Sequence, residues 1–422
     1  MIYYNSIKKK IFNKKLKVGI IGMGYVGFPL SLIASKKFKV IGFDISKKRI
    51  NFLKKNNLLK KNKNLILSSQ KNILKKCDFF IICLPTPLKK NKDPDLSYVK
   101  NGFETIKPFL KNGQVISLES TSYPGTTREI ISKNLEKLRF KIGKNFFVGF
   151  SSEREDPGNK KHKLEDIVKV YSGHTSKCTN IMKMFYSLIF NSVYMAGSLE
   201  VAEMSKLLEN IYRSVNIGLV NEMKKICTKM NIDIQDVIKA AETKNFGFNV
   251  FWPGPGMGGH CIPIDPFYLT WKAKEFGVKS RFIELAGEIN SEMPLWVFNR
   301  VKEILDEKNI SIFNSKILLL GVAYKKNIDD TRGSPAFKLI ELMLKNNAKV
   351  SYNDNFVKNL KIKHKNFNSK SLNLTKKELS KFDLVLLVTD HDYYDRKFLI
   401  NNSKLIFDTR FYFNKNEKVH KC

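Results

Sequence analysis

The sequence predicts an α/β protein made of two doubly wound, Rossmann-like domains joined by a long central helix. Two observations predict this fold. At both ends of the 422-residue chain, short continuous apolar segments alternate with helical segments, a pattern typical of parallel sheets covered by helices on both faces. Between these ends, residues 199–229 form one long helical pattern with small, apolar and polar residues on all sides, which suits a helix packed on several neighbours.

The first domain begins with a strand, a glycine turn, a helix and a second strand. We expect the first strand at residues 16–21, the helix at 28–37 and the second strand at 39–43, directly before Asp44. This order is a βαβ unit. Apolar runs at 77–83 and 115–118 predict two further buried strands of the same sheet.

The same order of elements returns near the end of the chain. Strands are expected at 315–320, 348–352 and 382–388, and the last resembles the run at 77–83. We therefore expect domains at 1–198, 199–305 and 306–422, with the long helix opening the central domain as a candidate dimer core. The lysine- and asparagine-rich stretches 54–63 and 358–377 are interpreted as exposed surface.

The composition favours a cytoplasmic protein without a metal site. No apolar run approaches the roughly 20 residues that a membrane-spanning helix needs, and residues 1–17 lack the apolar segment of a secretory signal, so we expect no membrane insertion. The six cysteines are scattered without a Cys-x-x-Cys pair, which argues against a disulfide framework and against zinc.

The formal charge of +36 raises the alternative of a nucleic-acid-binding protein. However, the lysines are spread along the whole chain and do not alternate with aromatic residues on one stripe. We therefore expect no nucleic-acid partner and attribute the charge to a bias toward lysine and asparagine codons. An anionic substrate would still be attracted by this charge.

A glycine-rich turn follows the first predicted strand and opens the first helix. It consists of Gly22, Met23, Gly24, Tyr25, Val26 and Gly27. In this context the turn is a dinucleotide fingerprint: Gly22 makes the tight turn, Gly24 admits the pyrophosphate and Gly27 lets helix and strand pack. Asp44 would accept hydrogen bonds from the ribose hydroxyls and repel a 2′-phosphate, which favours NAD over NADP.

A second segment rich in glycine and proline, residues 254–266, presents one thiol and one carboxylate, Cys261 and Asp265. Its glycines, among them Gly256 and Gly258, allow the backbone to approach a ligand closely, and its prolines reduce chain entropy. We interpret it as a rigid loop that holds the thiol against a ligand.

Three segments occur in order along the chain: 22–29 (GMGYVGFP), 258–261 (GGHC) and 330–335 (DTRGSP). Together they resemble the UDP-glucose/GDP-mannose dehydrogenase family, and the resemblance extends from about residue 15 to residue 410. It implies an NAD-dependent, four-electron oxidation of a nucleotide-sugar alcohol to its acid, with a UDP sugar as substrate and a homo-oligomeric enzyme.

The resemblance gives catalytic roles to five residues. Oxidation of an aldehyde to an acid needs a nucleophile, and Cys261 would supply the thiolate. Lys206 and Asn210, one helical turn apart, would stabilise the oxyanion and position a water or sugar hydroxyl. Asp265 would hold water or relay protons, or else cap the following helix, and Glu153 would act in substrate handling and thioester hydrolysis.

Other positions match the family's ligand contacts. The cofactor side includes Arg49, Thr86, Thr121 and Arg332. The substrate side includes Glu153, Lys206, Asn210, Gly256, Gly258, Tyr324, Lys325 and Arg410. Because residues 321–324 lack a glycine fingerprint, we expect the last domain to bind the nucleotide sugar and not a second NAD.

The substrate branch is inferred from residues 153–158, which read Glu-Arg-Glu-Asp-Pro-Gly. They are similar to the branch that acts on UDP-N-acetylhexosamines, and residues 253–271 are most similar to UDP-N-acetylglucosamine 6-dehydrogenases. Pro157 replaces a glutamate of the UDP-glucose branch, and Ser152 replaces a usual proline. UDP-glucose and UDP-N-acetylmannosamine stay open as substrates, as does a regulatory protein without turnover.

Overall fold

Eight strands form the sheet of the first part of the chain, in the order β3-β2-β1-β4-β5-β6-β7-β8. Neighbouring strands are parallel except for the antiparallel pair β6 and β7. The strands are β1 (Lys17–Ile21), β2 (Lys39–Phe43), β3 (Leu65–Ser68), β4 (Phe79–Ile82), β5 (Val115–Leu118), β6 (Phe147–Ser151), β7 (Lys169–Gly173) and β8 (Val193–Met195). The strands expected at 16–21, 39–43, 77–83 and 115–118 are confirmed as β1, β2, β4 and β5.

The computed structural model describes residues 1–55, 59, 62–89, 91–154, 163–259, 262–362 and 367–421. The chain divides into two compact units. The first unit comprises Met1–Glu209 and Phe267–Val278, and the second comprises Asn210–Pro266 and Lys279–Cys422. The α/β fold class with parallel sheets is confirmed in both units.

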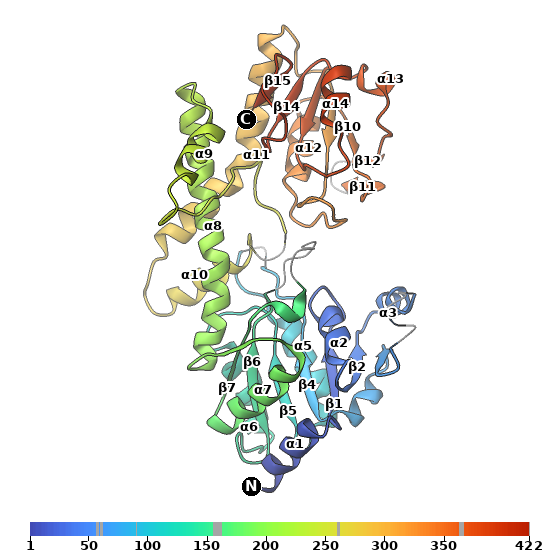
Figure 1. Ribbon diagram of the computed structural model, residues 1–422, viewed down its shortest axis with the longest axis vertical. Helices are drawn as coiled ribbons and strands as arrows, with labels where there is room; N and C mark the ends of the chain where they lie inside the picture. Colours follow the sequence, from blue (N-terminus) through green and yellow to red (C-terminus); the bar gives the residue numbers. More distant parts are fainter. Residues whose placement is uncertain are drawn as a thin grey trace. The chain divides into compact units, whose positions relative to one another are not determined.

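Helices cover the sheet of the first unit. They are α1 (Ile2–Phe12), α2 (Gly27–Ala34), α3 (Lys47–Lys54), α5 (Ser97–Ile106), α6 (Lys133–Lys137) and α7 (Ser176–Ile189), with short turns η1 (Lys71–Lys76), η2 (Lys107–Phe109), η3 (Thr127–Ser132) and η4 (Leu164–Asp166). Helix α1 lies beside α7 on the sheet (Figure 1) and buries Ile7 and Ile11 in the core. The lysine-rich start of the chain is therefore a packed helix.

The second unit has a five-stranded parallel sheet in the order β10-β9-β13-β14-β15. Its strands are β9 (Lys316–Leu320), β10 (Lys349–Asn353), β13 (Leu384–Leu387), β14 (Ile406–Asp408) and β15 (Val419–Lys421). Its helices are α9 (Ile234–Glu242), α11 (Arg281–Glu307), α12 (Pro335–Lys345), α13 (Lys376–Leu379) and α14 (Arg396–Asn402). In β9, Ile317 and Leu319 face one core while Leu318 and Leu320 face the other, so both faces of the sheet are covered.

One interpretation of this region is wrong in part. The stretch 358–377, expected to be exposed surface, contains the antiparallel hairpin β11 (Asn359–Ile362) and β12 (Phe367–Lys370). Leu360, Ile362 and Phe367 are buried. Lysines and asparagines on the outer face hid the alternation of apolar residues that marks a half-buried strand.

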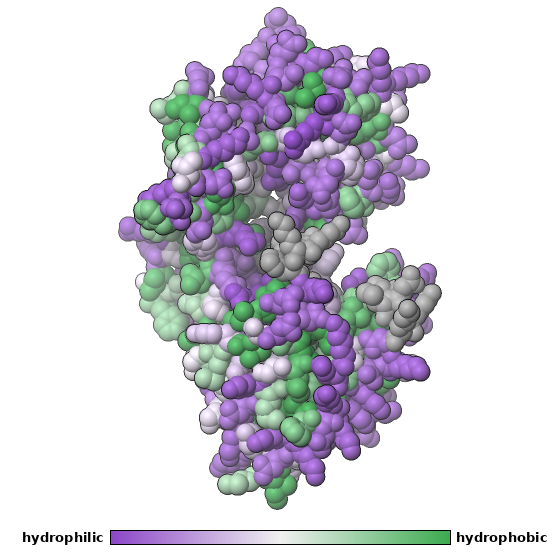
Figure 2. All heavy atoms as spheres, in the orientation of Figure 1, coloured by the Kyte–Doolittle hydropathy of each residue, from purple (hydrophilic) through white to green (hydrophobic). Residues whose placement is uncertain are grey.

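Helix α8 spans Leu199–Lys229 without a break, as the sequence predicts, and α10 spans Asp265–Lys274. Hydrophilic side chains cover most of the visible face of both units (Figure 2), in agreement with lysines distributed along the whole chain. Among the described residues, no helix combines the length and the apolar character needed to cross a bilayer.

Candidate active site

The glycine turn between β1 and α2 has the shape that a dinucleotide requires. Gly22 has φ +96°, and a Cβ added there would lie 2.3 Å from the Cys83 carbonyl oxygen. A Cβ added to Gly27 would lie 1.9 Å from the Gly22 oxygen, whereas one added to Gly24 would meet no atom within 4 Å. The first and third glycines therefore serve the turn and the packing, and the second borders open space. The turn fits the pyrophosphate of NAD.

Asp44 is held in place by the turn itself. Met23 N donates to Asp44 Oδ2 at 2.9 Å, and Ser46 N donates to Oδ1 at 2.8 Å. Arg49 Nε donates to the Met23 carbonyl oxygen at 2.8 Å, so the Arg49 side chain restrains the turn. Each carboxylate oxygen keeps a lone pair that could accept a ribose hydroxyl. Tyr25 is 45% exposed.

Thr86 and Thr121 lie beyond the carboxyl ends of the adjacent strands β4 and β5. Ser120 ties these ends together, because its Oγ donates to the Leu84 oxygen at 2.7 Å and accepts from Leu84 N at 2.9 Å. The sheet order reverses between β1 and β4, and ligands of doubly wound sheets bind at such a switch point. Both threonines therefore lie at the edge where the cofactor is expected.

Buried thiols are poor candidates for the nucleophile. Four cysteines of the described chain are buried, namely Cys77, Cys83, Cys178 and Cys227. Burial raises the pKa of Cys77 to about 12, with a contribution from Asp78, and burial also raises the pKa of Cys83. Cys261 and His260 lie outside the described residues. In the described part of the chain, no group of three or more His, Cys, Asp or Glu side chains could hold a metal ion.

Glycines of residues 254–259, before Cys261, pack tightly against later residues of the second unit. A Cβ added to Gly258 would lie 2.5 Å from Tyr324 Cβ, and one added to Gly254 would lie 2.7 Å from an Arg410 guanidinium nitrogen. Gly259 N donates to the Arg332 carbonyl oxygen at 2.9 Å. The structure thus brings the loop together with three residues matched to ligand contacts. Gly256 has φ +135° and lies against Pro294 and Pro335, and Lys325 is half-buried beside Tyr324.

The two arginines of this group are fixed by their own neighbours. Arg332 donates to both carboxylate oxygens of Asp330, with Nη2–Oδ2 at 2.7 Å. Arg410 Nε donates to the Val388 oxygen at 2.8 Å. Burial lowers the pKa of Arg410, and Asp390 and Asp408 oppose this effect. The guanidinium groups are therefore held in place, a property suited to binding phosphate or carboxylate oxygens.

Helix α8 carries Lys206 in the first unit and Asn210 at the start of the second, and both are buried. Asn210 Nδ2 donates to Asp265 Oδ2 at 2.5 Å, and Asp265, 3% exposed, is the first residue of α10. This pairing between two residues of the predicted site was not visible in the sequence. It fixes a carboxylate four residues after Cys261.

Glu153 follows β6 and is 7% exposed. Its Oε1 accepts from Arg154 N at 2.7 Å, and its Oε2 lies 3.5 Å from Lys169 Nζ. Lys169 also contacts Glu119 Oε2 at 2.7 Å. Sequence reasoning missed both Lys169 and Glu119, because a lysine that opens a strand and a glutamate that ends one give no signal of their own.

Comparison with known proteins covers both units. Three domain models of the UDP-glucose/GDP-mannose dehydrogenase family match: the NAD binding domain at residues 16–190, the central domain at 200–292 and the UDP binding domain at 318–415. A UDP-N-acetyl-D-glucosamine 6-dehydrogenase of Pseudomonas aeruginosa is 36% identical over 82% of this chain and 84% of its own.

Other relatives carry a different sugar in their names. A UDP-N-acetyl-D-mannosamine dehydrogenase of Methanococcus maripaludis is 35% identical over 93% of this chain and 92% of its own. The solved structure of a UDP-D-ManNAc dehydrogenase from Pyrococcus horikoshii superposes with a TM-score of 0.87 at 27% identity, over 96% of this chain and 99% of that one.

Proposed function

Because the chain belongs to the UDP-glucose/GDP-mannose dehydrogenase family and is an NAD-dependent oxidoreductase of UDP sugars, we propose that it oxidises a UDP-N-acetylhexosamine at C6 to the uronic acid. UDP-N-acetylglucosamine is the proposed sugar, and surface polysaccharide synthesis the proposed use. Relatives named for the gluco and manno epimers have nearly equal identity, so the class of sugar has more support than the epimer.

The observation that supports this reaction most directly is the fixation of the chain on both sides of Cys261. On one side, Gly259 N is bonded to the Arg332 oxygen. On the other, Asp265 accepts a hydrogen bond from Asn210. The described residues that flank the proposed nucleophile in the sequence are therefore each held by a hydrogen bond, and catalysis by a nucleophile depends on restrained groups around it.

We infer the following roles for the chain's residues. Bound NAD would accept one hydride at a time, so the four-electron oxidation uses two NAD molecules in succession. The Lys206 ammonium stabilises the alkoxide that forms as C6 is oxidised to the aldehyde, and Asn210 with Asp265 orients a hydroxyl or water. The Cys261 thiolate then adds to the aldehyde carbon, and loss of the second hydride leaves a thioester. Glu153 takes a proton from the water that cleaves the thioester, releasing the acid and the thiol.

In the UDP binding domain, Lys325 and Arg410 are the proposed cationic partners of the nucleotide. Arg410 is already oriented by Val388, so little freedom is lost when it binds an anion. Tyr324 offers an aromatic ring beside the loop. The +36 charge would draw a UDP sugar toward the protein from any side.

We also propose a dimer through α8. Apolar side chains are exposed along the helix at helical spacing: Val201, Met204, Leu208, Tyr212, Leu219, Met223 and Ile226. A stripe of this length needs cover, and a second copy of the same helix offers a matching stripe. Leu219→Lys should halve the mass measured by light scattering, whereas Leu138→Lys, at an exposed leucine elsewhere, should not.

The decisive experiment counts NADH formed per sugar consumed. Purified protein and NAD are mixed with UDP-glucose, UDP-N-acetylglucosamine or the galacto and manno epimers of the latter. Two NADH per UDP-N-acetylglucosamine, abolished in Cys261→Ser, is the expected result. Two NADH from UDP-glucose alone would keep the chemistry and overturn the substrate. No NADH from any sugar, together with steeply salt-dependent binding of DNA or RNA, would favour the nucleic-acid alternative.

A further inference from the structure

We propose that Lys169, itself held by a buried ion pair with Glu119, positions the Glu153 carboxylate for hydrolysis of the Cys261 thioester. This inference rests on the proposed function, in which Glu153 acts on that thioester. Lys169 and Glu119 act through Glu153, so they are positioning residues and not catalytic ones.

Three described oxygen atoms lie within 3.5 Å of the Lys169 ammonium. Lys169 opens β7, and its side chain is 3% exposed. Its Nζ lies 2.7 Å from Glu119 Oε2, 3.2 Å from the Ser152 carbonyl oxygen and 3.5 Å from Glu153 Oε2. The ammonium donates hydrogen bonds to Glu119 and to the Ser152 oxygen, whereas its contact with Glu153 is an ion pair without a hydrogen bond. The two short contacts hold the ammonium in place. The third is a longer electrostatic contact with the Glu153 carboxylate.

Glu119 is equally restrained. It directly follows β5, and its Oε1 accepts from the Tyr186 hydroxyl at 2.5 Å. Ser117 Oγ lies 3.0 Å from the same hydroxyl. The Lys169 Nζ also lies 5.7 Å and 5.2 Å from the ring centroids of Tyr186 and Phe190. Aromatic rings stabilise a buried cation, so these two rings help to hold the ammonium in this position.

The Lys169 ammonium therefore forms ion pairs with two carboxylates, those of Glu119 and Glu153. Burial by itself lowers the pKa of Lys169, but the charges of Glu119 and Glu153 raise it, so the lysine stays protonated. Burial raises the pKa of Glu119, Lys169 lowers it and Glu153 raises it. A charged Glu119 partly neutralises the Lys169 ammonium. The charge on Glu119 consequently affects how strongly the ammonium attracts the Glu153 carboxylate.

Three other described groups near this cluster stay neutral or have partners of their own. Cys83, after β4, has a pKa raised by burial and stays a neutral thiol. Tyr186, on α7, has a pKa raised well above its usual value by burial and by Glu119, so it stays a neutral donor. The guanidinium of Arg154 pairs instead with Glu209 at 2.7 Å. Among the described residues of this cluster, Lys169 is thus a cation in direct contact with Glu153.

The test uses two substitutions that change the charge near Glu153 in opposite senses. Lys169→Met removes the cation 3.5 Å from the proposed catalytic carboxylate, so the acid limb of kcat against pH should move up by about one to three units. Glu119→Gln keeps a hydrogen-bonding side chain but removes the competing anion, so the same limb should move down by about one unit. Lys39→Met, at the exposed first residue of β2, is the matched control and should leave the limb in place.

A purely structural ion pair would lower the melting temperature of both variants without moving either limb, and that result overturns the inference. If Lys169→Met does not fold, the double variant Lys169→Met/Glu119→Gln removes both buried charges, and its limb should lie between those of the two single variants. If the wild type oxidises no UDP-N-acetylhexosamine, the proposed substrate fails first. The pH series is then run on the UDP sugar that is oxidised, which tests the ion pair separately.

Discussion

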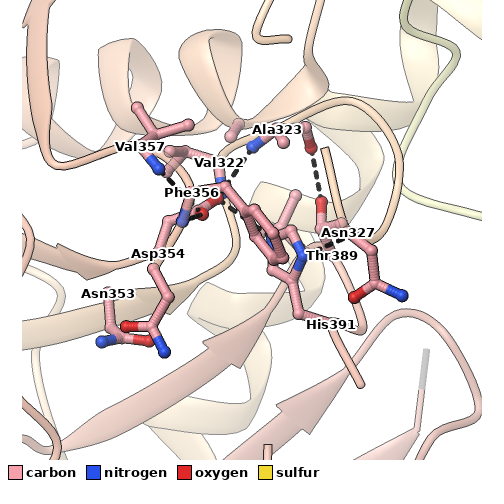
Figure 3. Close-up of polar contacts among 12 residues, drawn as sticks. Val322, Ala323, Asn327, Asn353, Asp354, Phe356, Val357, Thr389 and His391 are labelled. Carbon is pink, nitrogen blue, oxygen red and sulfur yellow. Dashed lines mark hydrogen bonds and ion pairs between the residues drawn. The ribbon is translucent and has the colours of Figure 1, made fainter. Parts of the chain in front are cut away.

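Asp44 and Asp354 take the same place in the two Rossmann-like units, but only Asp354 is closed off by the protein. Each directly follows the second strand of its sheet, and each accepts at 2.9 Å from the residue after a turn glycine, Met23 N or Val322 N. Asp44 is partly exposed, whereas Asp354 is fully buried. Asp354 has four further donors, gathered around it in Figure 3: Ala323 N, Phe356 N, Val357 N and His391 Nε2. A carboxylate that we propose binds ribose in one unit thus has a counterpart that binds the protein itself in the other.

Asp354→Asn should destabilise the second unit by about 3 kcal/mol, because an amide nitrogen would face backbone N–H donors in a buried site. Burial raises the pKa of Asp354, but His391 and the backbone donors lower it further, to below 3.8. Its contribution to stability is therefore present above pH 3.8 and is lost as the pH falls through the folded value. Urea unfolding of wild type and variant at pH 7 and pH 3 measures both effects, and equal stabilities at pH 7 would contradict the assignment.

Asp44→Asn, the same substitution in the other unit, should leave the melting temperature nearly unchanged. It should instead weaken NAD binding about tenfold and reduce the preference for NAD over NADP, since the carboxylate proposed to accept ribose hydroxyls and to repel a 2′-phosphate is lost. Calorimetric titration with both cofactors gives the two affinities. An unchanged NAD affinity would remove Asp44 from the cofactor site.

Two glycines of the same turn should respond in different ways to alanine. Gly24→Ala places a methyl in open space, so the free protein should keep its stability while the KM for NAD rises about tenfold or more. Gly27→Ala drives a methyl to 1.9 Å from the Gly22 oxygen and should cost about 1–3 kcal/mol of stability even without NAD. Thermal unfolding with and without NAD separates the two, and a destabilised Gly24→Ala protein would argue against an open cradle.

The strands and the glycine turn could be predicted because short apolar runs and glycine positions carry their signal locally. Lys169 could not be. Lys17 and Lys39 also open apolar strands and are exposed, so the three positions look alike in the sequence. Burial of Lys169 depends on β7 pairing antiparallel with β6, which brings it beside Ser152 and Glu153.

Other parts of the chain show the same difference between local sequence patterns, which could be recognised, and contacts between distant residues, which could not. The family motifs located Asn210 and Asp265 separately, but their hydrogen bond joins residues 55 positions apart in the sequence. In α1, Ile7 and Ile11 are spaced by four residues and offered a helical signal, which the many lysines obscured. Contacts between distant segments thus escaped prediction, whereas the local patterns, apart from α1, predicted the main strands and helices.

Glu203 should make the first unit less stable as the pH rises toward neutrality. It is 1% exposed and accepts from Gly125 N at 2.5 Å and from Thr127 N at 2.8 Å, which joins α8 to the start of η3. Burial raises its pKa from 4.5 to about 7, although these hydrogen bonds lower it. Because the folded value is the higher one, the stabilisation is complete below pH 4.5 and is lost as the pH rises through about 7.

The shift corresponds to a loss on the order of 3 kcal/mol between these limits. Glu203→Gln cannot titrate, so its stability should fall by that much less than the stability of the wild type when urea unfolding is compared at pH 5 and pH 8. Glu104→Gln, at an exposed carboxylate that pairs with Lys107 on the surface, is the control and should keep the wild-type dependence. Parallel pH dependences in wild type and Glu203→Gln would mean that Glu203 is already ionised at pH 5, and that its hydrogen bonds to the η3 turn outweigh its burial.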